Sequence, residues 1–404
     1  MTPEPVTLRS LWLRVYLPAL MFFLADGAIL PIIALAARDL GASVAFAGFV
    51  VALRSLGVLF FDLPGGWIIG RYGERVAVAF ASTCFAATLL GWIVSDSLTV
   101  FAVLAFVQGS GWSVWQLARM SYVAGVVGPD LRGRALSILG GISRLGWFIG
   151  PFLGAAAIAI GGFHAAYALA LALALLAAVL LFRYSSANEG RDEHGDEPST
   201  LFVVIRRHRH ELLTVGWAAL AMQALRAARF AIVPLWADHI GLSTATIGVL
   251  FGISTGVELL CVYLGGSIMD RHGRKAVAVP SIALIAAGIA MLPLTHHLWS
   301  LTLVAILLGL GNGISSGLNM TLGADLAPAT GRAQFLGVWR VFGDIGTAGG
   351  PLAIAAVTGL LTLGGAAVTC GAMGLLAAAM IHRLVPETKQ RALAGAALAE
   401  PADG

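Results

Sequence analysis

The stretch GGWIIGRYGER, residues 65–75, ends a long apolar run at glycines and arginines, and a near copy, GGSIMDRHGRK, returns at residues 265–275. The two copies lie 200 residues apart (265 − 65). One position differs chemically, because Gly70 stands where the copy has Asp270. A boundary that returns in this way indicates a chain built from two similar halves.

The composition indicates that lipid is the solvent. Of 404 residues, 58% are hydrophobic and only 11% are charged, with a mean hydropathy of +0.88, whereas a soluble domain carries about 25% charged residues. Runs of roughly 20 apolar residues can cross a bilayer, and backbone hydrogen bonding in lipid leaves only helices or closed barrels. We predict an all-α membrane protein with twelve transmembrane helices, approximately at 14–37, 44–69, 76–95, 98–126, 135–160, 163–182, 213–237, 244–269, 276–294, 299–325, 335–360 and 362–383.

The basic residues predict the orientation, because Lys and Arg concentrate in cytoplasmic loops. The loops on one side hold only Arg38, whereas the termini and the other loops hold Arg9, Arg14, Arg71, Arg75, Arg132, Arg134, Arg183, Arg191, Arg206, Arg207, Arg209, Arg271, Arg274, Lys275, Arg332, Arg383, Lys389 and Arg391. We expect a multi-pass protein of the inner (cytoplasmic) membrane with both termini in the cytoplasm. The first apolar block is expected to be a retained helix and not a signal peptide. The pI near 9.2 follows from this inside bias, so no nucleic-acid partner is expected.

The 200-residue shift extends along both halves. It also pairs Gly66 with Gly266, Gly109 with Gly309, Gly111 with Gly311, Arg132 with Arg332, Gly146 with Gly346, Gly150 with Gly350 and Pro151 with Pro351. Six helices repeated in parallel predict two six-helix bundles that rock against each other around a midplane cavity. We expect the first bundle at 1–182, a polar cytoplasmic linker at 183–212, the second bundle at 213–384 and a cytoplasmic tail at 385–404.

The polar segments and the cysteines predict neither a metal nor a cofactor. In the segment LFVVIRRHRHELL, residues 201–213, His208 and His210 fit a solvated basic face along the membrane surface, with a metal site as the weaker alternative. The three cysteines each lie inside an apolar block, so we expect buried free thiols: Cys84, Cys261 and Cys370.

Three motifs carry a resemblance that covers essentially the whole chain. The loop pattern G-x-x-x-D-R-x-G-R-R/K appears as Gly66, Gly70, Arg71, Gly73 and Arg75, and again as Gly266, Asp270, Arg271, Gly273, Arg274 and Lys275. The pattern G-x8-G-x3-G-P-x2-G-G appears as Ser137, Gly146, Gly150, Pro151, Gly154 and Ala155, and a PETK tail follows at 386–389. The chain resembles a twelve-helix member of the major facilitator superfamily. The second pattern resembles that of its drug/metabolite:proton antiporters.

The resemblance implies a gating role for the loop motif. Glycines let the loop turn tightly and let helices approach closely, while basic residues can bind carbonyls at a neighbouring helix end. In the family, the aspartate of this motif lies near a helix N-terminus of the other bundle and holds the cytoplasmic side shut. Gly70 cannot do this, so the expected gating residues of the loops are Asp270, Arg71 and Arg271.

Charges inside the apolar blocks must pair or line a wet cavity, because each costs about 2.5–3.5 kcal/mol at the bilayer centre. They are Asp26, Arg54, Asp62, Arg119, Arg144, Arg226, Arg229, Glu258, Arg340 and Asp344. The resemblance implies that the second and eleventh helices meet across the bundle interface, as do the fifth and eighth. With equal depth from the inner helix ends, this predicts two pairs between the bundles, Asp62–Arg340 and Arg144–Glu258. The competing partner of Arg340 is Asp344, four residues along the same helix. Each pair is either a static ion pair or one that breaks and re-forms during transport.

Asp26, in FLADGAILP, is the candidate for proton coupling. The resemblance implies a protonatable acid in the outer half of the first helix, and burial disfavours the charged form of a carboxylate. Its repeat mate is Arg226, so a permanent Asp26–Arg226 ion pair is the alternative. One departure from the antiporters is that Gln108 follows Ala105 where their motif carries an arginine.

The expected substrate cavity contains more arginines than acids. Arginine matches carboxylate and phosphate geometry, which favours an anionic substrate. The cavity candidates are Arg119, Arg226, Arg229, Gln108, Trp112 and Trp115. The tryptophans, together with Trp147, Trp236 and Trp339, fit helix packing or an interfacial belt as the alternative.

These observations predict a secondary active transporter that moves a small molecule by alternating access, most simply proton-coupled efflux of a drug or metabolite. The alternative is a uniporter or proton symporter of an organic anion or sugar. The chain has no G-x-x-x-x-G-K-[ST] loop, which excludes ATP as the driver. No intramembrane constellation favours an enzyme; a lipid flippase and a sensor are weaker rivals. We expect a monomer whose partners are its substrate, protons and the bilayer.

Overall fold

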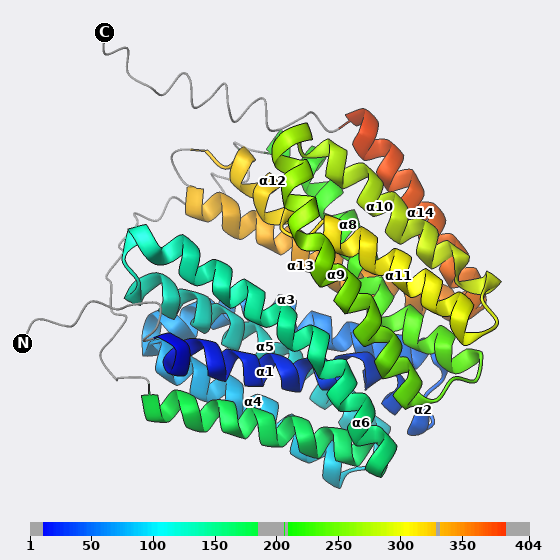
Figure 1. Ribbon diagram of the computed structural model, residues 1–404, viewed down its shortest axis with the longest axis horizontal. Helices are drawn as coiled ribbons and strands as arrows, with labels where there is room; N and C mark the ends of the chain where they lie inside the picture. Colours follow the sequence, from blue (N-terminus) through cyan, green and yellow to red (C-terminus); the bar gives the residue numbers. More distant parts are fainter. Residues whose placement is uncertain (1–10, 185–205, 207–208, 329–331, 385–404) are drawn as a thin grey trace, which may run out of the picture. The chain divides into compact units, whose positions relative to one another are not determined.

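The computed structural model describes residues 11–184, 206, 209–328 and 332–384 (Figure 1). In these residues eleven helices are long and apolar enough to cross a membrane. The longest of them, Gly133–Arg183, has 51 residues, which is about 77 Å of helix against about 30 Å of hydrocarbon. Its backbone leaves the helical conformation at Gly161 and Gly162. The break divides it into two crossings, which confirms the predicted twelve.

Contacts divide the chain into two compact units. Unit 1 comprises Met1–Gly195 and Ala237–Thr255, and unit 2 comprises Asp196–Trp236 and Gly256–Gly404. The segment Ala237–Thr255 therefore groups with the first half, although the repeat assigns it to the second. Most of the expected linker at 183–212, and the tail from residue 385, lie outside the described residues, so the division into bundle, linker, bundle and tail stays a prediction.

The N-terminal part of unit 1 consists of a broken first helix followed by four longer ones, of which the last, α6, contains two crossings. The first crossing, Trp12–Asp39, changes to a 3₁₀ turn at Pro31, which cannot donate a backbone hydrogen bond. The elements of this unit are η1 (Trp12–Tyr16), α1 (Leu17–Ile29), η2 (Leu30–Ile32), α2 (Ile33–Asp39), α3 (Val44–Tyr72), α4 (Glu74–Val94), α5 (Leu98–Val126) and α6 (Pro129–Tyr184).

Close contact between α6 and α1 explains the antiporter-type glycine pattern. Gly146, Gly150 and Gly154 recur every four residues and so share one face of α6. A Cβ added to them would lie 2.4 Å from Phe23 Cβ, 2.7 Å from the carbonyl carbon of Gly27 and 2.3 Å from the oxygen of Ala28, respectively. Any larger side chain would push α6 away from α1. Pro151 lies on the same stretch of α6.

The last glycine of the loop motif ends a helix in each half. Gly73 ends α3 with φ +82°, and Gly273 follows α9 with φ +95°. Glycine reaches positive φ without steric cost. The repeated motif therefore encodes two equivalent turns, as its sequence predicts.

Unit 2 repeats this plan. Gly346 and Gly350 of α13 pack against α8, since an added Cβ would lie 2.2 Å from the oxygen of Leu220 and 2.0 Å from that of Ala224. One crossing, Leu298–Leu326, is interrupted near Gly317, which has φ +83°. The elements of this half of the chain are α8 (Arg209–His239), α9 (Thr244–His272), α10 (Lys275–Met291), η3 (Leu292–Leu294), α11 (Leu298–Ile314), α12 (Leu318–Leu326), α13 (Arg332–Leu360) and α14 (Leu363–Leu384). The end of α8 and the start of α9, within Ala237–Thr255, belong to unit 1.

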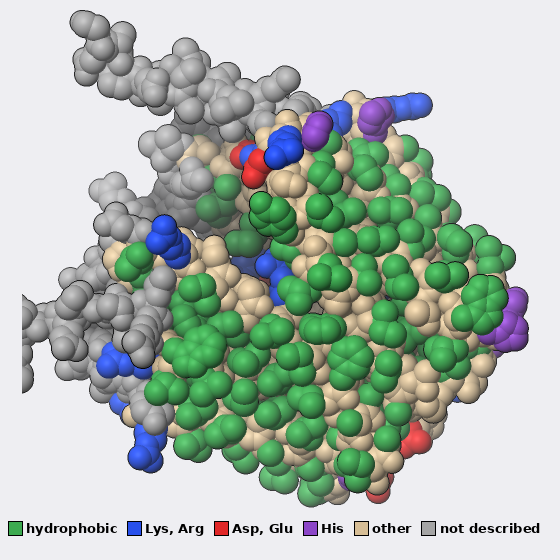
Figure 2. Space-filling view, in the orientation of Figure 1, with side chains coloured by type: hydrophobic (Ala, Val, Ile, Leu, Met, Phe, Trp, Pro, Cys, Tyr) green, Lys and Arg blue, Asp and Glu red, His purple; other side chains and the backbone are tan. Residues whose placement is uncertain are grey.

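The outer surface is apolar, as a lipid-facing surface requires. Figure 2 shows hydrophobic side chains over most of the visible face. Large apolar side chains such as Ile160, Leu260 and Tyr263 are 88%, 78% and 84% exposed. In water this would favour aggregation; in a bilayer it is the expected contact with acyl chains.

Candidate functional site

Asp26 lies at the centre of a buried polar cluster in unit 1. The residue is fully buried. Oδ1 accepts hydrogen bonds from Arg54 Nη2 at 2.7 Å and from Gln108 Nε2 at 3.1 Å, and Oδ2 accepts one from Trp147 Nε1 at 3.1 Å. These residues come from α1, α3, α5 and α6, so one carboxylate is bound by side chains from three other helices.

Arg54 holds the cluster together. Its Nε donates to Gln108 Oε1 at 2.6 Å, and its Cζ lies 5.8 Å from the centre of the Trp112 ring. Arg54 and Asp26 form an ion pair whose side chains are 11% and 1% exposed. Breaking a buried pair by removing one partner costs about 3–5 kcal/mol, because the other charge is left uncompensated.

Arg54 is recognisable in the sequence as an intramembrane charge, but it is not among the predicted site residues. It predicts Arg226 as the alternative partner of Asp26, whereas the structure pairs Asp26 with Arg54. The depths of the two residues below their shared turn could have predicted this pair. Asp26 lies 13 residues before Asp39 and Arg54 lies 10 residues after Val44, which is about 20 Å and about 15 Å from the shared turn. A long arginine side chain covers that difference.

Arg54 also places a positive charge beside Gln108, where the arginine of the antiporter motif is missing from this chain. The antiporter motif places an arginine three residues before this glutamine, where the chain has Ala105. Here a guanidinium reaches the glutamine from the neighbouring helix α3 instead.

A second polar cluster lies in unit 2. Arg229 Nη2 lies 2.8 Å from Glu258 Oε2, and these side chains are 6% and 15% exposed. Arg226 Nε donates to Asn312 Oδ1 at 2.5 Å. By the 200-residue repeat, the helices α8, α9 and α11 correspond to α1, α3 and α5. The two clusters therefore use equivalent helices with the charges reversed: acid then arginine in unit 1, arginine then acid in unit 2.

Two of the predicted gating residues, Arg340 and Asp62, each have a partner in their own half of the chain. Arg340 Nε lies 3.6 Å from Asp344 Oδ2, which is the intrahelical pairing that the sequence offers as the alternative. Asp62 accepts a hydrogen bond from Ser113. Arg144 is half-buried on α6. The pairs Asp62–Arg340 and Arg144–Glu258 stay predictions.

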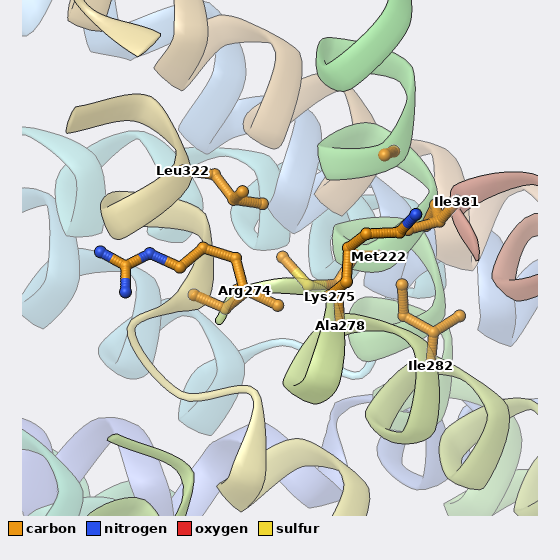
Figure 3. A pocket seen from close by; sticks show the side chains of 9 residues that line it. Met222, Arg274, Lys275, Ala278, Ile282, Leu322 and Ile381 are labelled. Carbon is orange, nitrogen blue, oxygen red and sulfur yellow. The ribbon is translucent and has the colours of Figure 1, made fainter. Parts of the chain in front are cut away.

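The second loop motif ties α9 and α10 to α12 and α14. Arg274 donates from Nε and Nη2 to Asp325 at 2.8 and 3.3 Å, and its Nη1 lies 3.8 Å from Asp270. Lys275 Nζ donates to the backbone oxygen of His382 at 2.5 Å. Figure 3 shows Arg274 and Lys275 pointing in opposite directions among apolar side chains of a small pocket. Asp270 is 81% exposed, and Arg71 and Arg271 are exposed.

The remaining cavity candidates lie in different places. Trp115 is fully buried and stacks on Phe22 with ring centres 4.0 Å apart, which is core packing. Trp112 stacks at 6.4 Å on Trp147, beside the Asp26 cluster. Arg119 is buried, and its Nη2 donates to the backbone oxygen of Arg14 at 3.0 Å.

The described residues contain no group of three or more His, Cys, Asp or Glu side chains that could hold a metal ion. The three cysteines are free thiols, buried at Cys261 and Cys370 and half-buried at Cys84. The predictions for His208 and His210 fall on side chains outside the described set.

Comparison with known proteins agrees with this architecture. The family model of the Major Facilitator Superfamily matches residues 15–351 and again 217–401. The MFS-type transporter YdeG of Bacillus subtilis (strain 168) is 27% identical over 357 residues, which cover 81% of this chain and 80% of YdeG. The multidrug resistance protein MdtH of Klebsiella pneumoniae (strain 342) is 25% identical over 332 residues, which cover 80% of this chain and 81% of MdtH.

A solved structure shares the fold. The crystal structure of a D-xylose-proton symporter superposes with a TM-score of 0.72 at 18% identity, covering 94% of this chain and 98% of the symporter. The family model and the fold cover nearly the whole length, and the two relatives cover 81% and 80% of the chain. The chain belongs to the Major Facilitator Superfamily, a family of membrane transporters.

Proposed function

We propose that this transporter exports a drug or metabolite in exchange for protons, by alternating access. The observation that supports proton exchange is the Asp26 cluster. A fully buried carboxylate with three side-chain donors lies on the first crossing, at the position where the sequence predicts a proton carrier. The similarity to the multidrug resistance protein MdtH supports export over uptake.

The geometry gives proton binding a direct structural effect. When Asp26 takes up a proton it loses its charge, so the attraction that holds Arg54 to α1 is lost. Arg54 keeps its hydrogen bond to Gln108 and its position beside Trp112. Protonation therefore loosens α3 from α1 while leaving the α3–α5 contact in place. A two-state transporter can couple such a change to the opening of one side.

The two protonation states present different sites to a substrate. With Asp26 ionised, the pair Asp26–Arg54 is neutral overall and compact. With Asp26 protonated, the cluster carries the positive charge of Arg54. A cationic substrate is therefore displaced by the proton, which is the behaviour an exchanger requires.

The second candidate function is transport of an organic anion or sugar without exchange, by uniport or proton symport. The observation that favours it is the cluster in unit 2, which contains two arginines, Arg226 and Arg229, and one acid, Glu258. Guanidinium groups bind carboxylates in a planar, two-point geometry.

Inside-out membrane vesicles with an imposed acid interior test both candidates. Ethidium, D-xylose and p-aminohippurate would be added in turn as cationic, neutral and anionic probes, and a pH-sensitive dye would report proton release. Release by one probe, absent from vesicles that carry Asp26→Asn, is the expected result for an exchanger. If none of the three probes causes proton release from vesicles that contain verified folded protein, proton-coupled export is contradicted and uptake of an anion or sugar is favoured. Right-side-out vesicles would then measure that uptake.

A further inference from the structure

Two arginines of the described residues are less than a tenth exposed, and only one of them has a carboxylate partner. Arg229 is 5% exposed and pairs with Glu258 at 2.8 Å. Arg119 is 3% exposed and has no acid within ion-pair distance among the described residues. Its Nη2 donates to the backbone oxygen of Arg14, and its Nε has no acceptor. A buried charge without a compensating partner is costly.

Arg119 lines a small pocket within unit 1. The guanidinium lies 5.5 Å from the ring centre of Tyr122. The pocket lies between α4, α5 and the last turns of α6, and the side chains around it are Glu74, Arg75, Val78, Arg119, Tyr122, Leu181 and Phe182. Glu74 and Arg75 begin α4, and Phe182 is next to the end of the last crossing of unit 1. The pocket is therefore at an edge of the membrane, where dissolved ions and lipid headgroups are present.

The charges around the pocket favour one negative group. Arg119 and Arg75 contribute two positive charges and Glu74 one negative charge, a balance of +1 (2 − 1). Glu74 Oε1 accepts a hydrogen bond from Ser121 at 3.0 Å, and Arg75 lies 5.9 Å from the ring centre of Phe182. A single carboxylate or phosphate would neutralise the site.

The repeat provides an internal comparison. The pocket of unit 2 in Figure 3 is lined at five equivalent positions, since 74, 75, 78, 122 and 181 become 274, 275, 278, 322 and 381 after a shift of 200. Position 119 becomes Asn319, and Arg274 is neutralised by Asp325. Of these two equivalent pockets, only the one in unit 1 contains a buried arginine without an acidic partner.

We propose that the unit 1 pocket binds an oxyanion, a carboxylate or a phosphate group, against Arg119, with Arg75 at its mouth. Guanidinium groups match the geometry of both oxyanions. The pocket is small, so it accepts one such group and not a drug-sized molecule. A free ion and a phospholipid headgroup share this chemistry. The site is separate from the Asp26 cluster and does not depend on the direction or coupling of transport.

Thermal unfolding of the purified full chain in detergent tests the proposal. A ligand that binds only the folded state raises Tm. We expect phosphate and acetate to raise Tm by a few degrees above chloride at equal ionic strength. Dihexanoyl phosphatidylglycerol, compared with dihexanoyl phosphatidylcholine, tests the lipid source. An increase in Tm with the free ions or with the phosphatidylglycerol supports the oxyanion site and shows whether the bound group comes from a free ion or from a lipid. If none of them raises Tm, the proposal is overturned.

The matched variants separate binding from general salt effects. Phosphate stabilises many proteins by exclusion from their surface, so the informative quantity is the difference between variants. Arg119→Met is expected to lose the anion-specific shift without a lower Tm in chloride, because a buried charge has been removed. Arg229→Met leaves Glu258 uncompensated, so it is expected to lower Tm in every buffer and to keep the shift.

If Arg119→Met does not fold, Val78→Phe fills the pocket and retains the arginine, and it should lose the shift equally. An anion response that persists in either folded variant would overturn the proposal.

Discussion

Arg54 Nη2 of α3 lies 2.7 Å from Asp26 Oδ1 of α1, in the interior of unit 1. The pair joins the first two crossings at the residue proposed to carry the proton. Because Gln108 and Trp147 bind the same carboxylate, a change of charge on Asp26 acts on α3, α5 and α6 together.

Asp26→Asn should abolish proton exchange, and it should also lower the stability of the protein, because Arg54 loses its anionic partner. Asparagine has nearly the same shape and keeps one oxygen that can accept from Arg54 or Gln108, but it cannot take up a proton at any ordinary pH. We expect substrate movement in vesicles to become independent of an imposed pH gradient. Transport that still follows the gradient in this variant would exclude Asp26 as the proton carrier.

Arg54→Met should destabilise the protein by about 3–5 kcal/mol, because it leaves a buried carboxylate without its cation. In the double variant Asp26→Asn with Arg54→Met, the free energy of unfolding should fall by much less than the sum of the two single-variant decreases, since residues in contact are energetically coupled. Thermal or detergent-induced unfolding measures both effects. Arg71→Met, at an exposed position, is the control; additive losses at 26 and 54 would contradict the pair.

Two glycines of α6 should respond to alanine with opposite signs. A Cβ at Gly150 would lie 2.7 Å from the carbonyl carbon of Gly27, whereas a Cβ at Gly141 would meet nothing within 4 Å. We expect Gly150→Ala to destabilise by about 1–3 kcal/mol through overpacking. Gly141→Ala should stabilise by up to about 1 kcal/mol through helix propensity. Equal effects in an unfolding assay would show that α6 is not in close contact with α1.

Glu258→Gln should lower the free energy of unfolding by an amount comparable to that expected for Arg54→Met. It removes the partner of Arg229, which is 5% exposed, and a buried unpaired arginine costs about 3–5 kcal/mol. Asp270→Asn is the matched control, because Asp270 is 81% exposed and surface charges contribute about 0–1 kcal/mol. Exchanging the two side chains, Arg229→Glu with Glu258→Arg, should recover part of the loss. If the exchanged variant recovers no stability, and its loss equals the sum of the two single-variant losses, the two residues do not form a direct ion pair.

Much of the fold is predictable because membrane spans are defined by length and hydropathy. The break at Gly161–Gly162 falls between the expected helices 135–160 and 163–182. The repeat is also visible in sequence, and the packing of Gly346 and Gly350 on α8 reproduces that of Gly146 and Gly150 on α1. Each of these features depends on local composition or on spacing along one helix.

The candidate site is only partly predictable. The position of Asp26 follows from its place in the first apolar block, and that of Gln108 from its match to the antiporter motif whose arginine Ala105 replaces. Arg54 is absent from the predicted site because no motif marks it. Trp115 illustrates the opposite case, since the sequence offers substrate contact and packing as alternatives and its ring lies flat on Phe22.

The sequence by itself determines that this chain crosses the membrane twelve times in two repeated halves, because hydrophobic length and periodicity are properties of each segment alone. It also determines the approximate depth of every charge, since a helix advances about 1.5 Å per residue. The tertiary structure decides which charges meet. Depth says nothing about rotation around the helix axis. That rotation is set by glycine contacts such as Gly150 on Gly27, which hold α6 against α1 and bring the Trp147 indole to Asp26.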